Sequence, residues 1–276
     1  RTHRVSWSVT RHHGKVEMSE PLTLSGIGPS PSMAYLRALI GEGDALREEI
    51  EGDADRLMQI VREKLEGFLM PYEFGLKEIL TKIEILSGEW DVTTPHNPIE
   101  HVKTRVKSMD SLLGKLVRTE CPPDLDEIRN RIRDIGGVRI TCSYVQDCYL
   151  VAHALASQPD ITLLEEKDYI ANVKPSGYRS LHLILEVPVF LSTRTIDVPI
   201  EVQIRTIAMD FWASAEHELK YKYRGELPAT MREKLVEIAA TAASLDEQMG
   251  IVRDQIEGPS LPGRESASPG GAPSET

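Results

Sequence analysis

Apolar residues recur at helical spacing along residues 33–87, so this segment is predicted to be helical. Two sets of apolar positions follow one another there, with Pro71 between them. Proline is favoured in the first turn of a helix and glycine just beyond the last. We therefore expect the second helix to begin near Pro71 and to end near Gly88. Residues 93–99 hold two prolines and an asparagine, a composition typical of a loop.

Beyond residue 137 the pattern includes segments with a period of two, which is typical of strands. In the clearest of them isoleucine and valine alternate with polar side chains, so that Glu201, Gln203 and Arg205 share a polar face. Strands are expected at 138–142, 181–187 and 195–205, and helices at 108–118, 124–134, 145–157, 206–221 and 229–256. Helices that bracket a central sheet make this an α/β or α+β fold.

The two ends of the chain lack this periodicity. Residues 1–30 are rich in Arg, His, Ser, Gly and Pro and are expected to form a flexible arm, and residues 258–276 are expected to form a disordered tail. We expect residues 31–257 to form one domain with helical extensions at both ends. The chain has 276 residues, 41% of them hydrophobic and 27% charged, which is an ordinary globular composition.

The sequence carries no sign of a membrane segment or an export signal. No apolar run approaches the roughly 20 residues of a membrane helix, and the first residues hold no signal-peptide core. The three cysteines lie far from any metal-ligand spacing, and so sparse a count fits reduced intracellular thiols. We therefore expect a cytoplasmic protein without a membrane partner.

The formal net charge of −11 argues against a stable nucleic-acid partner, because non-specific binding to DNA or RNA needs a basic surface. One basic stretch, residues 103–118, interrupts the acidic background. Its cations are Lys103, Arg105, Lys107, Lys115 and Arg118. Such a stretch suits a small polyanion such as a nucleotide. A solvated helix face is the alternative interpretation.

Two carboxylates are candidates for holding a metal ion. Asp134 is expected to close a helix just before Gly136 and Gly137 lead into a strand, and Glu201 lies on the polar face of its own strand. Phosphoryl-type transfer needs carboxylates that hold Mg²⁺, which neutralises phosphate oxygens. The alternatives are that Asp134 only makes a local turn and that Glu201 only pairs with Arg205 on an exposed sheet face.

The segment 167–182, KDYIANVKPSGYRSLH, combines lysines with aromatic residues. We expect Lys167 and Tyr169 to share a strand face, and residues 174–177 to form the turn that leads to Tyr178. The chain has neither a GxxxxGK[ST] loop nor a GxGxxG after a strand, so bound phosphates would need side-chain cations and a metal. Lysines for phosphates and a ring for a base fit a nucleotide site. A surface hairpin with a core tyrosine explains the pattern equally well.

Taken together, five motifs resemble the synthetase domain of the RelA/SpoT family. In chain order they are TRVKS at 104–108, RDIGGVRI at 133–140, DYIANVKPSGYRSLH at 168–182, EVQIRT at 201–206 and EHELKYK at 216–222. The resemblance covers about residues 35–256, and the flanking helices are similar to those of the small alarmone synthetases. It implies a nucleotidyltransferase-like mixed β-sheet flanked by helices. It also implies a GTP/GDP diphosphokinase, which transfers pyrophosphate from ATP to the 3′-hydroxyl of GDP or GTP.

The resemblance assigns the basic stretch to the ATP site. Arg105 and Arg139 would clamp the adenine between their guanidinium planes, and Lys107 and Lys115 would hold the phosphates. These roles suit the residue types, because arginine stacks on a base and lysine pairs with a phosphate.

The resemblance also assigns the chemistry. Asp134 and Glu201 would carry Mg²⁺, and Glu201 would in addition orient or deprotonate the attacking 3′-hydroxyl. Gln203 and Arg205 would support Glu201 from the same strand face.

The acceptor site follows from the third motif, where Tyr178 would stack on guanine. The other residues implied to line the guanosine nucleotide and its phosphates are Lys167, Tyr169, Lys174, Ser176 and His182. The family's loop usually reads Pro-Asn-Gly-Tyr, whereas this chain has Ser176 in place of the asparagine. Serine keeps a hydroxyl but loses the two amide donors and the carbonyl.

Long members of the family also carry an alarmone hydrolase domain with a metal-binding His-Asp pair, and no His-Asp dipeptide occurs in this chain. We therefore expect a synthetase without a hydrolase. The alternative is a catalytically inactive homologue that binds nucleotides as a regulator, which the intact Asp134 and Glu201 argue against. The resemblance further implies a homotetramer. The last predicted helix carries an apolar stripe that could seat a partner helix, made of Leu235, Ile238, Ala239, Ala242 and Leu245.

Overall fold

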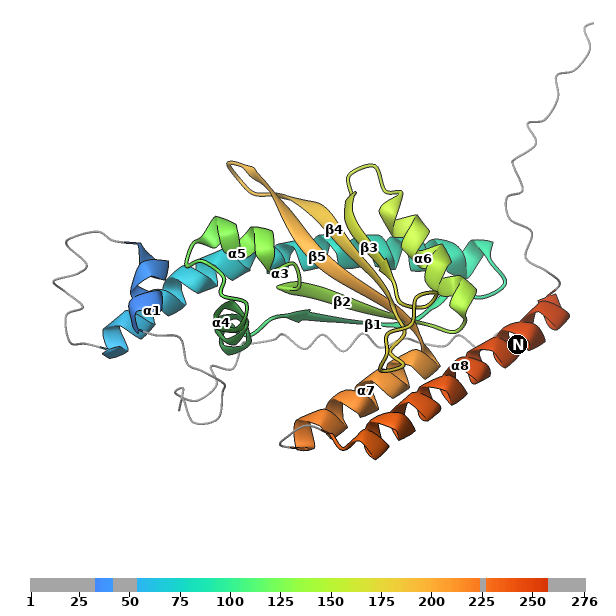
Figure 1. The fold of residues 1–276 in the computed structure, drawn as a ribbon. Coiled ribbons are helices and arrows are strands. Elements are labelled where there is room, and N and C mark those ends of the chain that lie inside the picture. Colours follow the sequence, from blue (N-terminus) through green and yellow to red (C-terminus); the bar gives the residue numbers. More distant parts are fainter. Residues whose placement is uncertain (1–32, 42–53, 224–226, 258–276) are drawn as a thin grey trace, which may run out of the picture.

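The computed structural model describes residues 33–41, 54–223 and 227–257 (Figure 1). The predictions of an arm at 1–30 and a tail at 258–276 lie outside the described residues. The helices are α1 (Met33–Ile40), α3 (Ala54–Thr93), α4 (Met109–Arg118), α5 (Leu125–Arg131), α6 (Val145–Ala156), α7 (Ile207–Lys222) and α8 (Ala229–Glu257). None of the described helices combines the length and the apolar character that crossing a membrane requires.

Five strands form one mixed sheet, which confirms the predicted fold class. They are β1 (Ile99–Val106), β2 (Gly136–Cys142), β3 (Thr162–Asp168), β4 (Leu181–Phe190) and β5 (Thr195–Thr206). Their order across the sheet is β1-β2-β5-β4-β3. The central strands β2 and β5 are parallel, whereas the other neighbouring strands are antiparallel.

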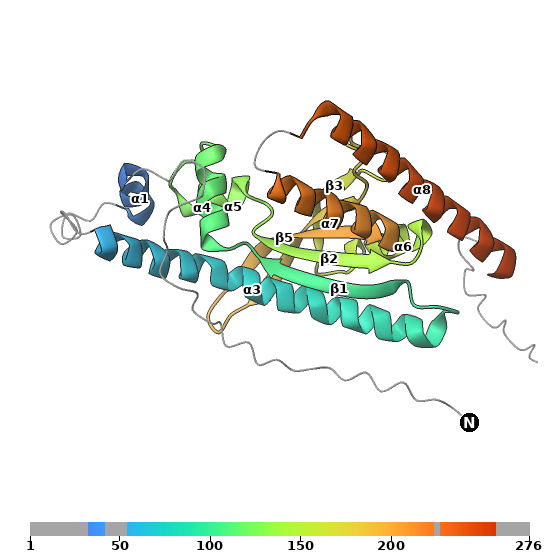
Figure 2. The same cartoon turned by 90° about the horizontal axis from the view of Figure 1, so that it is seen from below.

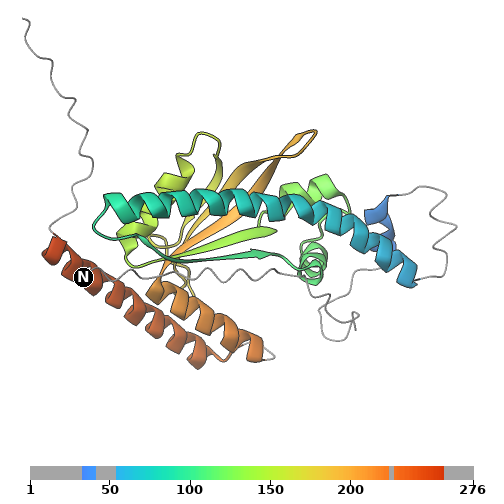
Figure 3. The same ribbon diagram turned by 180° about the vertical axis from the view of Figure 1, so that it is seen from behind.

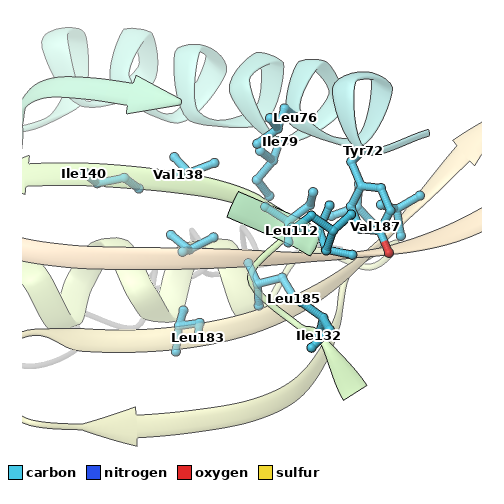
Figure 4. Packing of buried hydrophobic residues seen from close by; sticks show 14 of the residues in the cluster. Tyr72, Leu76, Ile79, Leu112, Ile132, Val138, Ile140, Leu183, Leu185 and Val187 are labelled. Atoms are coloured by element: carbon cyan, nitrogen blue, oxygen red, sulfur yellow. The ribbon is translucent and has the colours of Figure 1, made fainter. Parts of the chain in front are cut away.

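The long helix α3 lies across one face of the sheet, as the view from behind shows (Figure 3). Its buried side chains recur every three or four residues and meet the apolar face of the strands (Figure 4). Two glycines allow this close approach. A Cβ at Gly136 would lie 2.7 Å from Ile200 Cδ1, and one at Gly75 would lie 3.3 Å from the same atom.

The helix breaks predicted at Pro71 and Gly88 are both wrong, because α3 runs through the two positions without interruption. A proline inside a helix costs roughly 3 kcal/mol. Buried side chains stand on either side of it, Phe68 and Tyr72 among them, and each large apolar group stabilises by roughly 1.5–3 kcal/mol. Burial therefore outweighs the proline. The apolar pattern also continues past Gly88 to the buried Trp90.

Two boundaries around the first half of the sheet also differ from the prediction. The sequence indicated no strand at 99–106, where β1 forms the edge of the sheet with most of its side chains exposed, so no alternation marks it. The helix expected at 124–134 ends at Arg131, and Gly136 already belongs to β2. Asp134 therefore lies in the turn between α5 and β2 and does not close a helix.

Helices α7 and α8 lie side by side on the side of the sheet opposite α3 (Figures 1 and 2). Thr206, the last residue of β5, caps α7, since its hydroxyl accepts a hydrogen bond of 3.1 Å from the backbone N–H of Met209. A small second core joins the two helices and consists of Trp212, Ala213 and Ala239. The strand face on this side carries the polar side chains that were singled out in the sequence.

Candidate active site

Strand register places one row of candidate residues across the sheet. Arg139 on β2 faces Gln203 on β5, which faces His182 on β4, which in turn faces Lys167 on β3. Because side chains alternate along a strand, Glu201 lies on the same face, two residues from Gln203. The alternation at 195–205 therefore predicted the polar face correctly.

Five of the predicted residues line one cavity of about 200 Å³ on this face. They are Lys167, Tyr169, Lys174, His182 and Glu201, and the cavity wall is completed by Glu165 and Ile184. Lys167 pairs with the neighbouring Glu165 at 2.9 Å. The cavity thus combines a carboxylate, two lysines and a ring, as the interpretation of 167–182 as a nucleotide site requires.

Aromatic rings and the Lys174 side chain lie close together at this cavity. The Tyr169 ring meets the His182 ring edge-on, with centroids 5.3 Å apart. Lys174 Nζ lies 4.1 Å from the Tyr169 centroid and 5.0 Å from the Tyr178 centroid. The turn that presents Lys174 closes as predicted, through a 2.8 Å bond from the Gly177 N–H to the Lys174 carbonyl.

A chain of polar contacts leads from Arg205 to Glu201. Arg205 donates to the Tyr178 hydroxyl at 2.7 Å, and this hydroxyl lies 2.7 Å from His182 Nε2. The other ring nitrogen, Nδ1, lies 3.3 Å from Glu201 Oε1. The alternative of a Glu201–Arg205 pair is not what forms, because Glu201 contacts His182 and Gln203.

These contacts hold Glu201 as a carboxylate. Burial raises its pKa, but the hydrogen bond and charge of His182, together with the hydrogen bond from Gln203, outweigh burial and leave the pKa below its ordinary value. Gln203 Nε2 donates to Glu201 Oε2 at 3.0 Å. An ionised carboxylate with a fixed orientation can accept a proton, hold a hydroxyl or bind a cation.

Asp134 forms a second charged centre. Lys107 Nζ lies 3.0 Å from one of its oxygens, and Lys115 Nζ lies 2.7 Å from the other. Asp134 therefore does not only make a local turn, because it also pairs with two lysines. Burial raises the pKa of Asp134, and the hydrogen bonds from Lys115 and Lys107 lower it further than burial raises it. The two lysines come from different elements, since Lys107 follows β1 and Lys115 lies on α4. The basic stretch is therefore not one helix face.

The two arginines proposed to hold a base lie near each other on adjacent strands. Arg105 on β1 faces Gly137, two residues before Arg139. Burial lowers the pKa of Arg139, and the charges of Arg205 and Arg105 lower it further. Arg105 is exposed. Arg105 and Arg139 thus place two cations on neighbouring strands, and guanidinium groups can stack on a flat π-system.

Asp210 was missed in the sequence. Its Oδ1 lies 3.3 Å from Arg139 NH1 and 3.3 Å from Arg205 NH1. It therefore links an arginine expected at the ATP adenine with the arginine that contacts Tyr178. The available signal was an acid in the first turn of the helix that follows EVQIRT. Ser176, by contrast, is not brought to the Glu201 cavity. It lines a separate hollow of about 720 Å³ against α7 and α8.

The residues present fit a divalent cation of the magnesium type. In the part of the chain that the structure describes, no three His, Cys, Asp or Glu side chains converge as a metal cluster. Magnesium in phosphoryl-transfer sites is usually held by one or two carboxylates together with substrate phosphates. Asp134 and Glu201 supply such carboxylates, and the charge of Asp134 raises the pKa of Glu201.

Comparison with known proteins agrees with this geometry. Residues 104–226 match the family described as a region found in RelA/SpoT proteins. The chain is 44% identical over 200 residues to the GTP pyrophosphokinase YwaC of Bacillus subtilis, covering 72% of this chain and 95% of that one. It is 38% identical over 192 residues to the GTP pyrophosphokinase YjbM of the same organism, covering 70% and 90%.

Solved structures give the same answer. Small alarmone synthetase 1 from Bacillus subtilis, bound to its product pppGpp, is 38% identical with a TM-score of 0.66, over 71% of this chain and 99% of that one. Small alarmone synthetase 2 from Bacillus subtilis is 44% identical with a TM-score of 0.64, over 69% and 98%. By sequence and by fold, this chain belongs to the RelA/SpoT family, among the small alarmone synthetases.

Proposed function

We propose that this protein is a GTP/GDP pyrophosphokinase, which transfers pyrophosphate from ATP to the 3′-hydroxyl of GDP or GTP and releases AMP. The observation that carries the proposal is the position of Glu201, an ionised carboxylate in a cavity with two lysines and two rings that meet edge-on. A relative supports it: small alarmone synthetase 1 from Bacillus subtilis is bound to pppGpp in one solved structure and to AMPCPP in another. The proposal includes a cytoplasmic location, where ATP and GTP are available.

On the donor side, we assign the ATP adenine to Arg105 and Arg139 and the phosphates to Lys107 and Lys115. Both lysines already point at one centre, Asp134. A triphosphate placed there gains two charge-assisted contacts without a search for side-chain conformations.

On the acceptor side, we assign the guanine ring to Tyr178. The phosphates and ribose fall to the residues around the cavity, which are Lys167, Tyr169, Lys174 and His182. Ser176 stays a proposed residue of the guanosine loop, although in this structure it lines the hollow against α7 and α8 and not the Glu201 cavity.

The transfer forms a bond between the 3′-oxygen and the ATP β-phosphorus, and it breaks the bond between that phosphorus and the α,β-bridging oxygen. AMP leaves with the bridging oxygen, and the hydroxyl proton passes to Glu201 or to water. When bound, Mg²⁺ supplies neutralisation of the charge on phosphate oxygens. The lowered pKa makes Glu201 a weak base. Its principal role would therefore be to hold the metal and orient the hydroxyl.

A thin-layer assay with labelled ATP, Mg²⁺ and each of GMP, GDP and GTP tests the proposal. We expect a labelled guanosine product with GDP and GTP, and no product when Mg²⁺ is removed with a chelator. A protein that binds both nucleotides but forms no product with any acceptor would be the inactive regulatory homologue instead.

The proposal includes a homotetramer. The structure divides the stripe predicted on α8, because Ala239 is buried against Trp212 whereas Ile238 and Leu245 are 42% and 54% exposed. Ile238 and Leu245 are seven residues apart, and the exposed positions continue along α8 at spacings of four, three and four residues, as Met249, Val252 and Ile256. A seam with this spacing is typical of a helix that packs on another helix. Light scattering tests it, since a mass near the 30.9 kDa of one chain would exclude an oligomer.

A further inference from the structure

The loop that presents Tyr178 rests directly on helix α8. Gly177 has a φ of +87°, and a Cβ built on it would lie 2.5 Å from the Ala239 Cβ and 3.6 Å from the Val236 Cα. No real Cβ tolerates the first distance. The backbone at Gly177 therefore fits α8 only because both residues are small, and the separation between loop and helix is fixed by the Ala239 methyl group.

Helix α8 is itself held to the rest of the fold at three points along its length. Trp212 Nε1 on α7 donates to the Leu235 carbonyl at 2.9 Å. The remaining two contacts are made by acid side chains: the Thr206 hydroxyl donates to Asp246 at 2.7 Å, and Arg253 donates to Asp147 on α6 at 3.2 Å. Asp246 and Asp147 are both buried. Because these contacts are spread along the helix, α8 offers the loop a fixed support.

The position of Gly177 is transmitted to the cavity through its neighbours. Its N–H bonds to the Lys174 carbonyl at 2.8 Å, and the Lys174 N–H bonds to the Tyr178 carbonyl at 3.3 Å. The Tyr178 ring packs against the Trp212 and Ala239 cluster, and its hydroxyl contacts His182. A shift of Gly177 away from α8 therefore moves the Tyr178 ring and the Lys174 amine together.

We propose that Ala239 is a positioning residue for the acceptor nucleotide, which sets the guanosine loop in place through its contact with Gly177. This inference rests on the assignment of Tyr178 to guanine. It places a determinant of acceptor affinity on α8, outside the segment 104–226 that matches the family. ATP binding does not depend on it, because Lys107, Lys115 and Asp134 lie on other elements.

The experiment compares Ala239→Val with Ala240→Val by calorimetric titration with GDP and, separately, with a non-hydrolysable ATP analogue. Ala240 is the next residue of the same helix and is exposed, so its variant carries the same helix-propensity cost without meeting the loop. We expect Ala239→Val to raise the Kd for GDP about tenfold and to leave the Kd for the ATP analogue within twofold. Ala240→Val should leave both constants unchanged, and kcat at saturating acceptor should change little in either variant.

A second pair guards against misfolding by overpacking. Ala239→Gly removes the methyl group without adding volume, so it loosens the support, and we expect a rise of about threefold in the Kd for GDP over the matched Ala240→Gly. Unchanged GDP binding in both Ala239 variants overturns the inference, as does an equal loss for GDP and the ATP analogue. A wild-type protein that binds no GDP would overturn the proposed function as well, which separates the two failures.

Discussion

The polar face has two halves that are built from different kinds of contact. The donor half surrounds Asp134 and is proposed to bind ATP, and the acceptor half surrounds Glu201 and is proposed to bind the guanosine nucleotide. Around Asp134 the contacts are ion pairs between long, partly exposed side chains, with 25% of Lys115 and 27% of Asp134 exposed. Around Glu201 the contacts are hydrogen bonds and ring packing, with only 13% of His182 and 19% of Glu201 exposed. The contacts around Asp134 are therefore between full charges, whereas those around Glu201 combine the charge of His182 with hydrogen bonds and ring packing.

This difference implies different costs of binding. The side chains around Glu201 already hold one another in place through His182, Gln203 and Tyr178, so little ordering is left for the acceptor to induce. The lysines near Asp134 are satisfied by a carboxylate that phosphate oxygens would displace or share. Donor binding should therefore depend on a metal that takes over Asp134, whereas acceptor binding should depend on the fit of the ring.

Glu201→Gln should have the largest effect, because the amide keeps the shape of the acceptor half and removes the charge. Turnover should fall by about 10²-fold or more, because the amide neither holds the metal nor orients the 3′-hydroxyl and accepts its proton, and the melting temperature should not change. Steady-state kinetics with GDP measures it. Glu166→Gln, an exposed carboxylate of β3 that does not line this cavity, is the control and should stay near wild type. Near-normal turnover of the Glu201 variant would remove Glu201 from the chemistry.

Tyr178→Ala should come next and should affect the acceptor half alone. Stacking on a base is worth roughly 1–3 kcal/mol, which is a loss of about 10- to 100-fold in affinity for GDP. Tyr178→Phe keeps the ring and loses only the hydroxyl contacts with Arg205 and His182, so its effect should be smaller. Titration of both variants with GDP and with an ATP analogue measures these effects. Equal losses of affinity for the two nucleotides would show that Tyr178 has only a structural role.

Lys107→Gln should weaken the donor half by about tenfold in the KM for ATP, because a hydrogen bond to a charged group contributes roughly 1.5–3 kcal/mol. The KM for GDP should not change. Lys77→Gln, at an exposed position of α3 on the other side of the sheet, serves as the control. An unchanged KM for ATP in the Lys107 variant would contradict the assignment of the donor half.

The smallest effect should be on the pH dependence of the free energy of unfolding, to which Asp134 and Asp246 should contribute with opposite signs. The pKa of Asp134 is lowered, so its stabilising contribution is present above its unfolded pKa of about 3.9 and is lost as pH falls through the folded pKa. Burial raises the pKa of Asp246 beneath the acceptor loop, although the Thr206 hydroxyl and Arg179 oppose it, so its ionisation costs stability as pH rises through the folded pKa.

Urea unfolding between pH 3 and pH 7 measures both effects. The free energy of unfolding of the wild type minus that of Asp134→Asn should rise with pH. The same difference measured against Asp246→Asn should fall with pH. Slopes of the same sign for the two variants would contradict the assigned environments.

Much of the acceptor half could be predicted because its residues are close in sequence. The alternation at 195–205 placed Glu201 and Gln203 on one face, and the turn at 174–177 was marked by proline and glycine. The strand register that aligns His182 with Gln203 is a tertiary property, which the local pattern does not contain.

The donor half was harder to predict, since it is assembled from segments without a clear period. The exposed edge strand β1 shows no alternation, so the sequence assigned Arg105 and Lys107 to no strand or helix. The helix start predicted at Pro71 is wrong because local propensity does not include the burial of Phe68 and Tyr72. This burial outweighs the cost of the proline. Asp210 was missed because its two arginine partners lie on strands that only the fold brings to the start of α7.

The stoichiometry of products tests the central claim most directly. Purified protein is incubated with ATP, GDP and Mg²⁺, and the nucleotides are separated by anion exchange and identified by mass. The account predicts AMP and a guanosine product that carries two additional phosphates, in equal amounts, with neither above background in the Glu201→Gln variant. ADP in place of AMP, or no guanosine product from the wild-type protein, would contradict it.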